Sequence, residues 1–128
     1  MLSEAQREIL HGRHYAVVGT LNADGSIQQT LIWYIFEDDQ IRFGLGAQSV
    51  KARNLRRSSQ ITLTIQVANR YLTVSGTASV EPPDDAMRRR IATRYMPPER
   101  LEEWLARQMA IERASVRMTI SRAYGQGT

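Results

Sequence analysis

The chain has 128 residues, of which 42% are hydrophobic and 23% charged, and its net charge is +4 with a pI near 10.0. These values are ordinary for a globular protein with a proper core, predict a single domain over residues 1–128, and admit an anionic partner. No stretch approaches the roughly 18 apolar residues of a membrane span, residues 1–12 lack a signal-peptide pattern, and there is no cysteine. The sequence therefore favours a cytoplasmic protein without disulfides or membrane contact.

The first part of the chain is predicted to form a short helix and then a meander of strands. Ser3 and Gln6 make a capping-box pattern and Gly12 is a stop signal, which together predict a helix over residues 3–11. Asn22-Ala23-Asp24-Gly25 is typical of a tight hairpin turn. The strands predicted here are Tyr15–Leu21, Ile27–Phe36 and Gln40–Leu45.

The second part alternates helices and strands. The predicted helices are Ser49–Arg57, Asp84–Tyr95 and a further one that begins at Pro97-Pro98. The predicted strands, which alternate apolar and polar residues, are Ile61–Val67, Tyr71–Glu81 and Ser115–Arg122. Gly76 and Ala78 suggest bending or close backbone approach, and residues 124–128 are expected to be a loose tail.

Six strands in hairpin order predict a mainly β fold, a closed or nearly closed six-stranded antiparallel barrel with short peripheral helices.

Catalytic side chains are scarce in this sequence. His11 and His14 are the only histidines, and no metal-ligand spacing is present. Glu37, Asp38 and Asp39 occupy a predicted turn, and Ser49 has no neighbouring base to activate it. The sequence therefore predicts no catalytic residue and no metal site.

Lys51 is the only lysine beside sixteen arginines. It follows Ser49 where a strand gives way to a helix, and the free backbone N–H groups of a first helical turn attract anions. A hydroxyl and an ammonium would complete a phosphate cradle there. The alternative, a lysine left by chance on a solvated helix face, stays open. If chemistry occurs, a bound phosphorylated cofactor should carry it.

The sequence resembles the pyridoxamine 5′-phosphate oxidase-like, flavin-binding split-barrel superfamily, and within it the small deazaflavin (coenzyme F-420)-dependent proteins. The resemblance runs through residues 5–122. Its motifs are Gly19–Leu21 through Asp24-Gly25 to Thr30–Tyr34, Ile41–Phe43 with Gly46 and Ser49–Arg57, and Tyr71–Ala78.

This resemblance implies a homodimeric split barrel with a coenzyme at the dimer interface and hydride transfer to or from a small organic substrate. Ser49 and Lys51 would contact the coenzyme phosphate, with Asn54 or Arg57 nearby. The residues implied along the ring are Thr30, Leu31, Ile32, Trp33 and Tyr34. Those implied along the sugar-like linker are Leu45, Gly46, Ala47 and Gln48.

Coenzyme F-420 is the first expectation for the cofactor and FMN the second. Trp33 and Tyr34 should face opposite sides of a strand, so at most one should stack on a ring. Residues 88–90 are expected in solvent, with the anionic tail of a deazaflavin as an alternative partner. The stripe Leu101, Trp104 and Leu105 is expected in core or dimer packing.

Two alternatives to an oxidoreductase remain. A carrier or sensor of a flavin or deazaflavin would keep the phosphate cradle and lack an open substrate space. A basic nucleic-acid-binding barrel would need exposed aromatic residues interleaved with arginine, and the Thr/Ser faces of residues 61–79 do not supply them.

Overall fold

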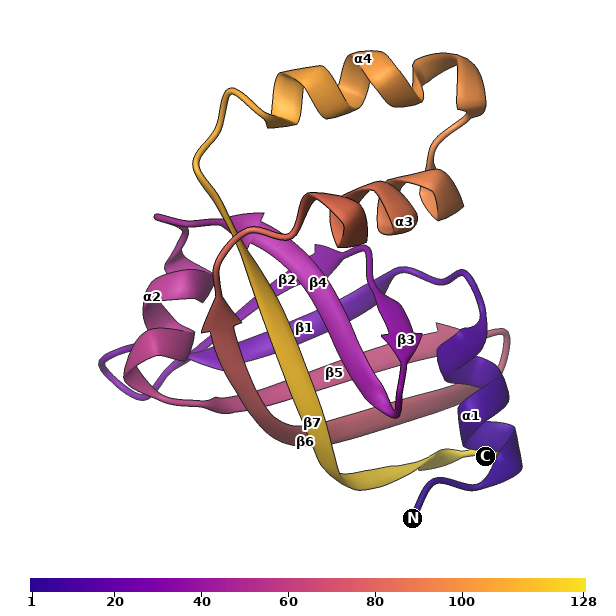
Figure 1. Cartoon of the computed structure of the whole chain (residues 1–128). Helices are drawn as coiled ribbons and strands as arrows, with labels where there is room; N and C mark the ends of the chain where they lie inside the picture. Colours follow the sequence, from indigo (N-terminus) through magenta and orange to yellow (C-terminus); the bar gives the residue numbers. More distant parts are fainter.

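The computed structural model describes residues 1–128 as one curled antiparallel sheet with helices around it (Figure 1). The strands are β1 (Ala16–Leu21), β2 (Ile27–Ile32), β3 (Ile35–Glu37), β4 (Gln40–Gly46), β5 (Gln60–Val67), β6 (Arg70–Glu81) and β7 (Arg113–Gln126). The helices are α1 (Glu4–His11), α2 (Val50–Arg57), α3 (Asp85–Tyr95) and α4 (Pro98–Gln108). None of these helices has the length and apolar character needed to cross a membrane.

Local signals fix most element ends. Ser3 Oγ accepts from the backbone N–H of Gln6 at 3.0 Å, and the Gln6 side chain accepts from the Ser3 N–H at 2.9 Å, so the predicted capping box is confirmed. Ser49 caps α2 by accepting from the N–H of Ala52 at 3.2 Å. Gly25 has a φ of 88° in the predicted hairpin turn, a conformation that glycine adopts without strain.

The sheet has seven strands in the order β2-β1-β5-β6-β7-β4-β3, whereas the sequence predicted six. The predicted strand Ile27–Phe36 is wrong as a single element, because it breaks at Trp33-Tyr34 into β2 and β3. These two strands lie at opposite edges of the sheet although only two residues separate them. The sheet must therefore curl until its edges meet, and covalent chain rather than strand pairing joins them.

Side chains hold the Trp33-Tyr34 junction where strand pairing is missing. Tyr34 is fully buried, and its hydroxyl donates to the carbonyl of Leu10 at 2.9 Å. Arg94 donates to the carbonyl of Tyr34 at 3.3 Å and to that of Gly12 at 2.9 Å. Burial raises the pKa of the Tyr34 hydroxyl, so this group stays a neutral donor.

The inward residues of the curled sheet form one hydrophobic core. Alternation places every second residue of a strand inside, and α1 and α2 close the ends with Ile9, Leu10, Ala52 and Leu55. Fully buried members from the strands are Val18, Ile41, Phe43, Leu63, Ile65, Val74, Val116 and Met118.

β6 and β7 approach each other closely at Gly76, as its sequence position suggested. A Cβ on Gly76 would lie 1.9 Å from the carbonyl oxygen of Thr119, so no larger residue fits without backbone movement. The pairing register shifts between Ser75 and Gly76, which leaves Ser121 as an extra residue in β7.

The expected loose tail is corrected in part. β7 continues to Gln126, which pairs with Tyr71, so only Gly127 and Thr128 follow the sheet. Beyond the bulge at Ser121 the pairing resumes, with Arg122 opposite Ser75 and Tyr124 opposite Thr73.

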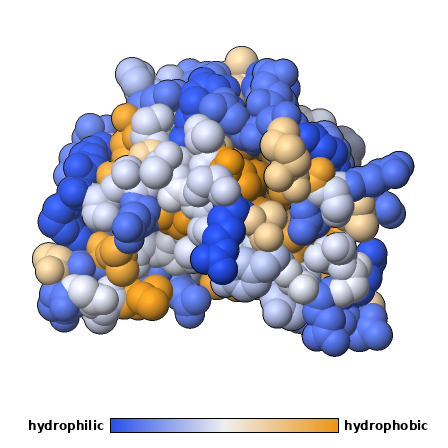
Figure 2. Space-filling model, turned by 90° about the horizontal axis from the view of Figure 1, so that it is seen from below, coloured by the Kyte–Doolittle hydropathy of each residue, from blue (hydrophilic) through white to orange (hydrophobic).

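Some large hydrophobic side chains remain exposed. They are Met1, Tyr15, Ile27, Leu31, Val50, Tyr71, Met109, Ile111 and Tyr124. On the face seen from below, hydrophobic groups form separate patches between polar and weakly polar ones (Figure 2).

The junction can be tested by removing one hydroxyl. We expect Tyr34→Phe to lower the free energy of unfolding by about 1–2 kcal/mol, because the carbonyl of Leu10 would lose its buried donor. Urea unfolding measures this, with the exposed Tyr71→Phe as control. Equal stability of the two variants would contradict the role assigned to the Tyr34 hydroxyl.

Candidate functional site

A cavity of about 390 Å³ lies between the outer face of β4 and the α3–α4 hairpin. On β4, Ile41, Phe43 and Leu45 point into the core, so Gly44 and Gly46 fall on the outer face, where they leave space. The lining residues are Tyr15, Leu31, Ile32, Trp33, Gly44, Leu45, Gly46, Lys51, Arg88, Ile91, Trp104 and Arg113. Three of these are cations, and none is a carboxylate, histidine or cysteine.

Lys51 enters this cavity from the first turn of α2. Its Nζ donates to Thr30 Oγ1 of β2 at 2.9 Å, a neutral partner that leaves the charge uncompensated. Burial lowers the pKa of Lys51, and the positive charge of Arg113 lowers it further. Both effects destabilise the charged form of Lys51, and a bound anion would compensate for them.

Ser49 caps α2 two residues before Lys51 and is not among the residues that line the cavity. Its oxygen already accepts from the N–H of Ala52, while its hydroxyl hydrogen can still be donated. Ser49 Cβ lies 3.8 Å from the position that a Cβ on Gly46 would take, so the cap of α2 is next to the surface that Gly44 and Gly46 form on the outer face of β4.

Arg113, at the start of β7, is the cation that the sequence interpretation missed. One terminal nitrogen of Arg113 lies 3.1 Å from where a Cβ on Gly44 would stand, so the side chain lies over the outer face of β4 at this glycine. Its Nε is buried without a hydrogen-bond partner. Burial lowers the pKa of Arg113, and the neighbouring Arg88 adds to that effect.

Arg88 corrects the expectation that residues 88–90 face solvent. It is 9% exposed and lines the cavity, and its one ion pair is with the exposed Asp85 at 3.5 Å. Arg89 and Arg90 are exposed, and they pair with Glu102 at 2.6 Å and Glu37 at 2.8 Å. Helical spacing puts consecutive residues on different faces, which separates Arg88 from its two neighbours.

Aromatic side chains form one wall of the cavity. Trp33 stacks on Tyr95 with ring centroids 5.1 Å apart and lies 5.3 Å from Trp104 at an angle of 35°. Tyr34 points into the core instead and does not line the cavity. Trp104 lines this wall, whereas Leu105 is the buried residue of α4.

The other residues named from the sequence lie around α2 and do not line the cavity. The Asn54 amide donates to Thr20 Oγ1 at 3.1 Å and to Asn22 Oδ1 at 2.9 Å, and Arg57 donates to the carbonyl of Leu21 at 2.7 Å. These bonds tie α2 to the β1–β2 hairpin. Ala47 and Gln48 use their carbonyls to accept from Arg56 and Arg53.

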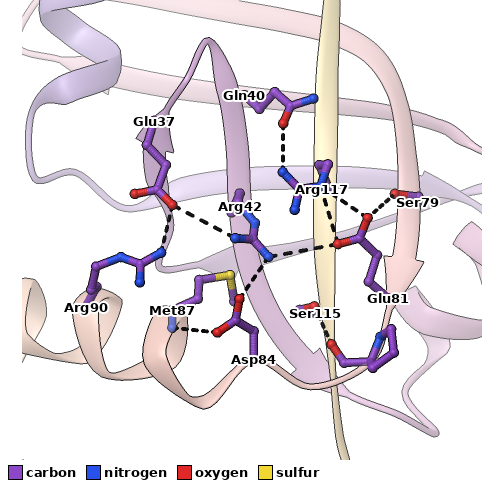
Figure 3. Close-up of polar contacts among 11 residues, drawn as sticks. Glu37, Gln40, Arg42, Ser79, Glu81, Asp84, Met87, Arg90, Ser115 and Arg117 are labelled. Carbon is purple, nitrogen blue, oxygen red and sulfur yellow. Dashed lines mark hydrogen bonds and ion pairs between the residues drawn. The ribbon is translucent and has the colours of Figure 1, made fainter.

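A network of ion pairs holds α3 over the cavity (Figure 3). Arg42, on the same face of β4 as the glycines, lies 3.3 Å from Asp84, 3.9 Å from Glu81 and 4.0 Å from Glu37. Asp84 also caps α3 by accepting from the N–H of Met87 at 3.0 Å. This cap bond and the charge of Arg42 lower the pKa of Asp84, so the network stays ionised at neutral pH.

A second hollow, of about 380 Å³, carries no charge. Its lining is Gly19, Thr20, Leu21, Ile27, Gln60, Ile61, Thr62, Ser75, Gly76, Thr77 and Ser121. No three His, Asp or Glu side chains stand close enough to hold a metal ion. The cavity lined by Lys51, Arg88 and Arg113 is the candidate site, because its three cations and its apolar walls suit an anionic ligand with an apolar part.

Comparison with known proteins gives one family match for the chain. Residues 2–127 match the family model described as pyridoxamine 5′-phosphate oxidase. A search of curated proteins finds no match.

Solved structures share the fold over nearly the whole chain. An F-420 reductase superposes with a TM-score of 0.78 at 19% identity, covering 96% of this chain and 98% of its own. A conserved hypothetical protein from Mycobacterium tuberculosis gives 0.77 at 23% identity, with 98% and 84% covered. General Stress Protein 26 from Bacillus anthracis gives 0.68 at 14% identity, with 93% and 88% covered. At these identities the likeness establishes the fold.

Arg42 and Arg113 allow a matched test of paired and unpaired cations. We expect Arg42→Met to lower the free energy of unfolding by about 1–3 kcal/mol, because three partly buried carboxylates lose their common partner. Arg113→Met should leave it unchanged or raise it by about 1 kcal/mol, since it removes a half-buried charge without a counter-ion. Urea unfolding without ligand measures both. A large loss of stability in Arg113→Met would contradict the description of that side chain as unpaired.

Proposed function

The chain belongs to the pyridoxamine 5′-phosphate oxidase family, and from that membership we propose that it is an oxidoreductase that uses a flavin or deazaflavin coenzyme. The observation that carries the proposal is a cavity with three cations, an aromatic wall and no carboxylate. Phosphorylated ring coenzymes combine the two properties that such a cavity favours, an anion and a flat apolar ring.

Lys51 and Ser49 would bind the coenzyme phosphate. The Lys51 ammonium is fixed by Thr30 and stands beside the capped first turn of α2, whose N–H groups attract an anion. Gly46 and the backbone of Leu45 would face the linker of the coenzyme, because both residues line the cavity that Lys51 enters.

The ring would lie against the wall formed by Leu31, Ile32 and Trp33. When bound, such a ring supplies hydride transfer. The protein's own contribution is to hold the phosphate, orient the ring and exclude water with apolar side chains. This division agrees with a cavity that contains no carboxylate, histidine or cysteine.

Coenzyme F-420 is the first candidate and FMN the second. The F-420 reductase with the same fold supports the deazaflavin, although its identity of 19% leaves the cofactor a proposal.

We also propose a homodimer. Tyr15 and Leu31 line the cavity and yet remain 62% and 67% exposed, so one wall is open. A second copy that covers these residues would close the site and bury their apolar surface. The substrate is then a small organic molecule that enters the remaining space.

Binding of the coenzyme tests the phosphate assignment. We expect titrations with FMN and with coenzyme F-420 to show saturable binding. Lys51→Ala should weaken this binding by about tenfold to a hundredfold, since one charge-assisted phosphate contact contributes about 1.5–3 kcal/mol. Arg53→Ala is the control, because Arg53 lies on the same helix, is exposed and contacts only the carbonyl of Gln48.

An equal loss in both variants would show that general positive potential, not Lys51, attracts the coenzyme. Coenzyme binding without hydride transfer to or from any small organic substrate would favour a carrier or sensor instead. Binding of oligonucleotides alone would overturn the proposed function.

The depressed pKa of Lys51 predicts the pH dependence of this binding. Because the folded-state pKa lies below 10.5, the ammonium is lost at a lower pH than in a free lysine, and affinity for the phosphate should fall as the pH rises through that range. Titrations at increasing alkaline pH measure the fall. It should be absent in Lys51→Arg, which keeps its charge, and a similar fall in that variant would assign the titration to another group.

A further inference from the structure

Two of the three cations in the cavity have donors that nothing in the protein uses. Arg113 makes no side-chain hydrogen bond or ion pair, and its Nε is buried without a partner. Arg88 is almost as fully buried as a core residue, yet its sole ion pair is a 3.5 Å contact with Asp85. Asp85 is largely exposed and lies outside the cavity.

Such an arrangement costs stability unless a ligand compensates it. A guanidinium removed from water needs hydrogen-bond partners and a counter-charge, and the neighbouring positive charge of Arg88 increases this need at Arg113. Buried polar groups in native proteins are nearly always paired, so unpaired ones require an explanation. An oxyanion between them would supply both acceptors and charge.

These two arginines approach the cavity from a different side than the phosphate site. Lys51 comes from α2 and is held by Thr30 of β2, whereas Arg88 comes from α3 and Arg113 from the start of β7. In the fold, α2 and α3 lie on separate sides of β4 (Figure 1). One terminal nitrogen of Arg113 lies close to Gly44 of β4.

We propose that Arg88 and Arg113 form a second oxyanion site, separate from the one at Ser49 and Lys51, and that it binds the carboxylate of the organic substrate. This inference rests on the proposed function, because it places a substrate beside the coenzyme. Guanidinium groups bind carboxylates through parallel N–H donors, which a point charge such as lysine cannot do.

The surroundings of the pair define the rest of the ligand. Ile91 is three residues after Arg88 on the same face of α3, and Trp104 and Trp33 stand on the aromatic wall. A carboxylate held by the arginines would therefore carry its organic part into apolar contact. The substrate class is a hydrophobic or aromatic carboxylic acid.

Benzoate and its neutral counterpart benzamide test this site. Both are titrated by calorimetry into the protein saturated with FMN or coenzyme F-420, and also into the protein alone. We expect benzoate to bind at least about tenfold more tightly than benzamide, because only the acid offers a charged acceptor to the two guanidiniums.

Variants then assign the binding to residues. Arg88→Met and Arg113→Met should each weaken benzoate binding by about tenfold or more and leave FMN affinity within about threefold, whereas Lys51→Ala should do the reverse. Arg107→Met is the control, since Arg107 is exposed on α4 without a side-chain bond. Thermal melting confirms that each variant is folded, and Arg88→Lys and Arg113→Lys should recover only part of the affinity.

Other outcomes overturn the proposal in distinct ways. Equal weakening of FMN by all three cavity variants would mean one anion site rather than two. Loss of coenzyme F-420 affinity in the arginine variants, with no benzoate binding, would assign the carboxylate to the coenzyme. If benzoate binds but neither coenzyme does, the oxyanion site is supported and only the proposed function is contradicted.

Discussion

Electrostatic repulsion among Lys51, Arg113 and Arg88 is the constraint on which the functional interpretation depends. The three cations line one cavity without a carboxylate, and burial together with a neighbouring positive charge disfavours the charged forms of Lys51 and Arg113. A protein keeps such a cluster only if the rest of the fold holds it in place. Here Thr30 fixes the ammonium, the glycines of β4 make room for Arg113, and α3 carries Arg88.

Both ends of α3 are fastened to the barrel, and this fixes Arg88 between them. At the start of the helix, Asp84 is bound by Arg42 of β4 (Figure 3). At its end, Arg94 donates to the backbone of the Trp33-Tyr34 junction, and the Tyr95 hydroxyl donates to the carbonyl of His14 at 2.7 Å. The Trp33-Tyr34 junction that closes the curled sheet thus also helps to position α3 over the cavity.

What the sequence predicted well was local. The capping box of α1, the Ser49 cap and the Gly25 turn each depend on residues within a few positions, and all are confirmed. The break at Trp33 was not predictable in this way, because residues 31–36 form one apolar run without glycine or proline, and only closure of the sheet interrupts it. Burial of Arg88 likewise depends on where α3 lies, and Arg113 meets Gly44 only through the pairing of β7 with β4. The alternation of Gly44 and Gly46 on one strand face was the available hint of a gap.

Arg42 and Arg113 lie on adjacent strands and differ in how their charges are balanced. Both lie on the outer face of the β4–β7 pair, and each has a buried Nε without a partner. Arg42 is surrounded by three carboxylates, so its charge is balanced within the folded chain. Arg113 has none, so its charge can be balanced only by a molecule from outside. A ligand that binds there stabilises the folded state by the interaction that the chain leaves unmade, which couples occupancy of the cavity to the stability of the whole sheet.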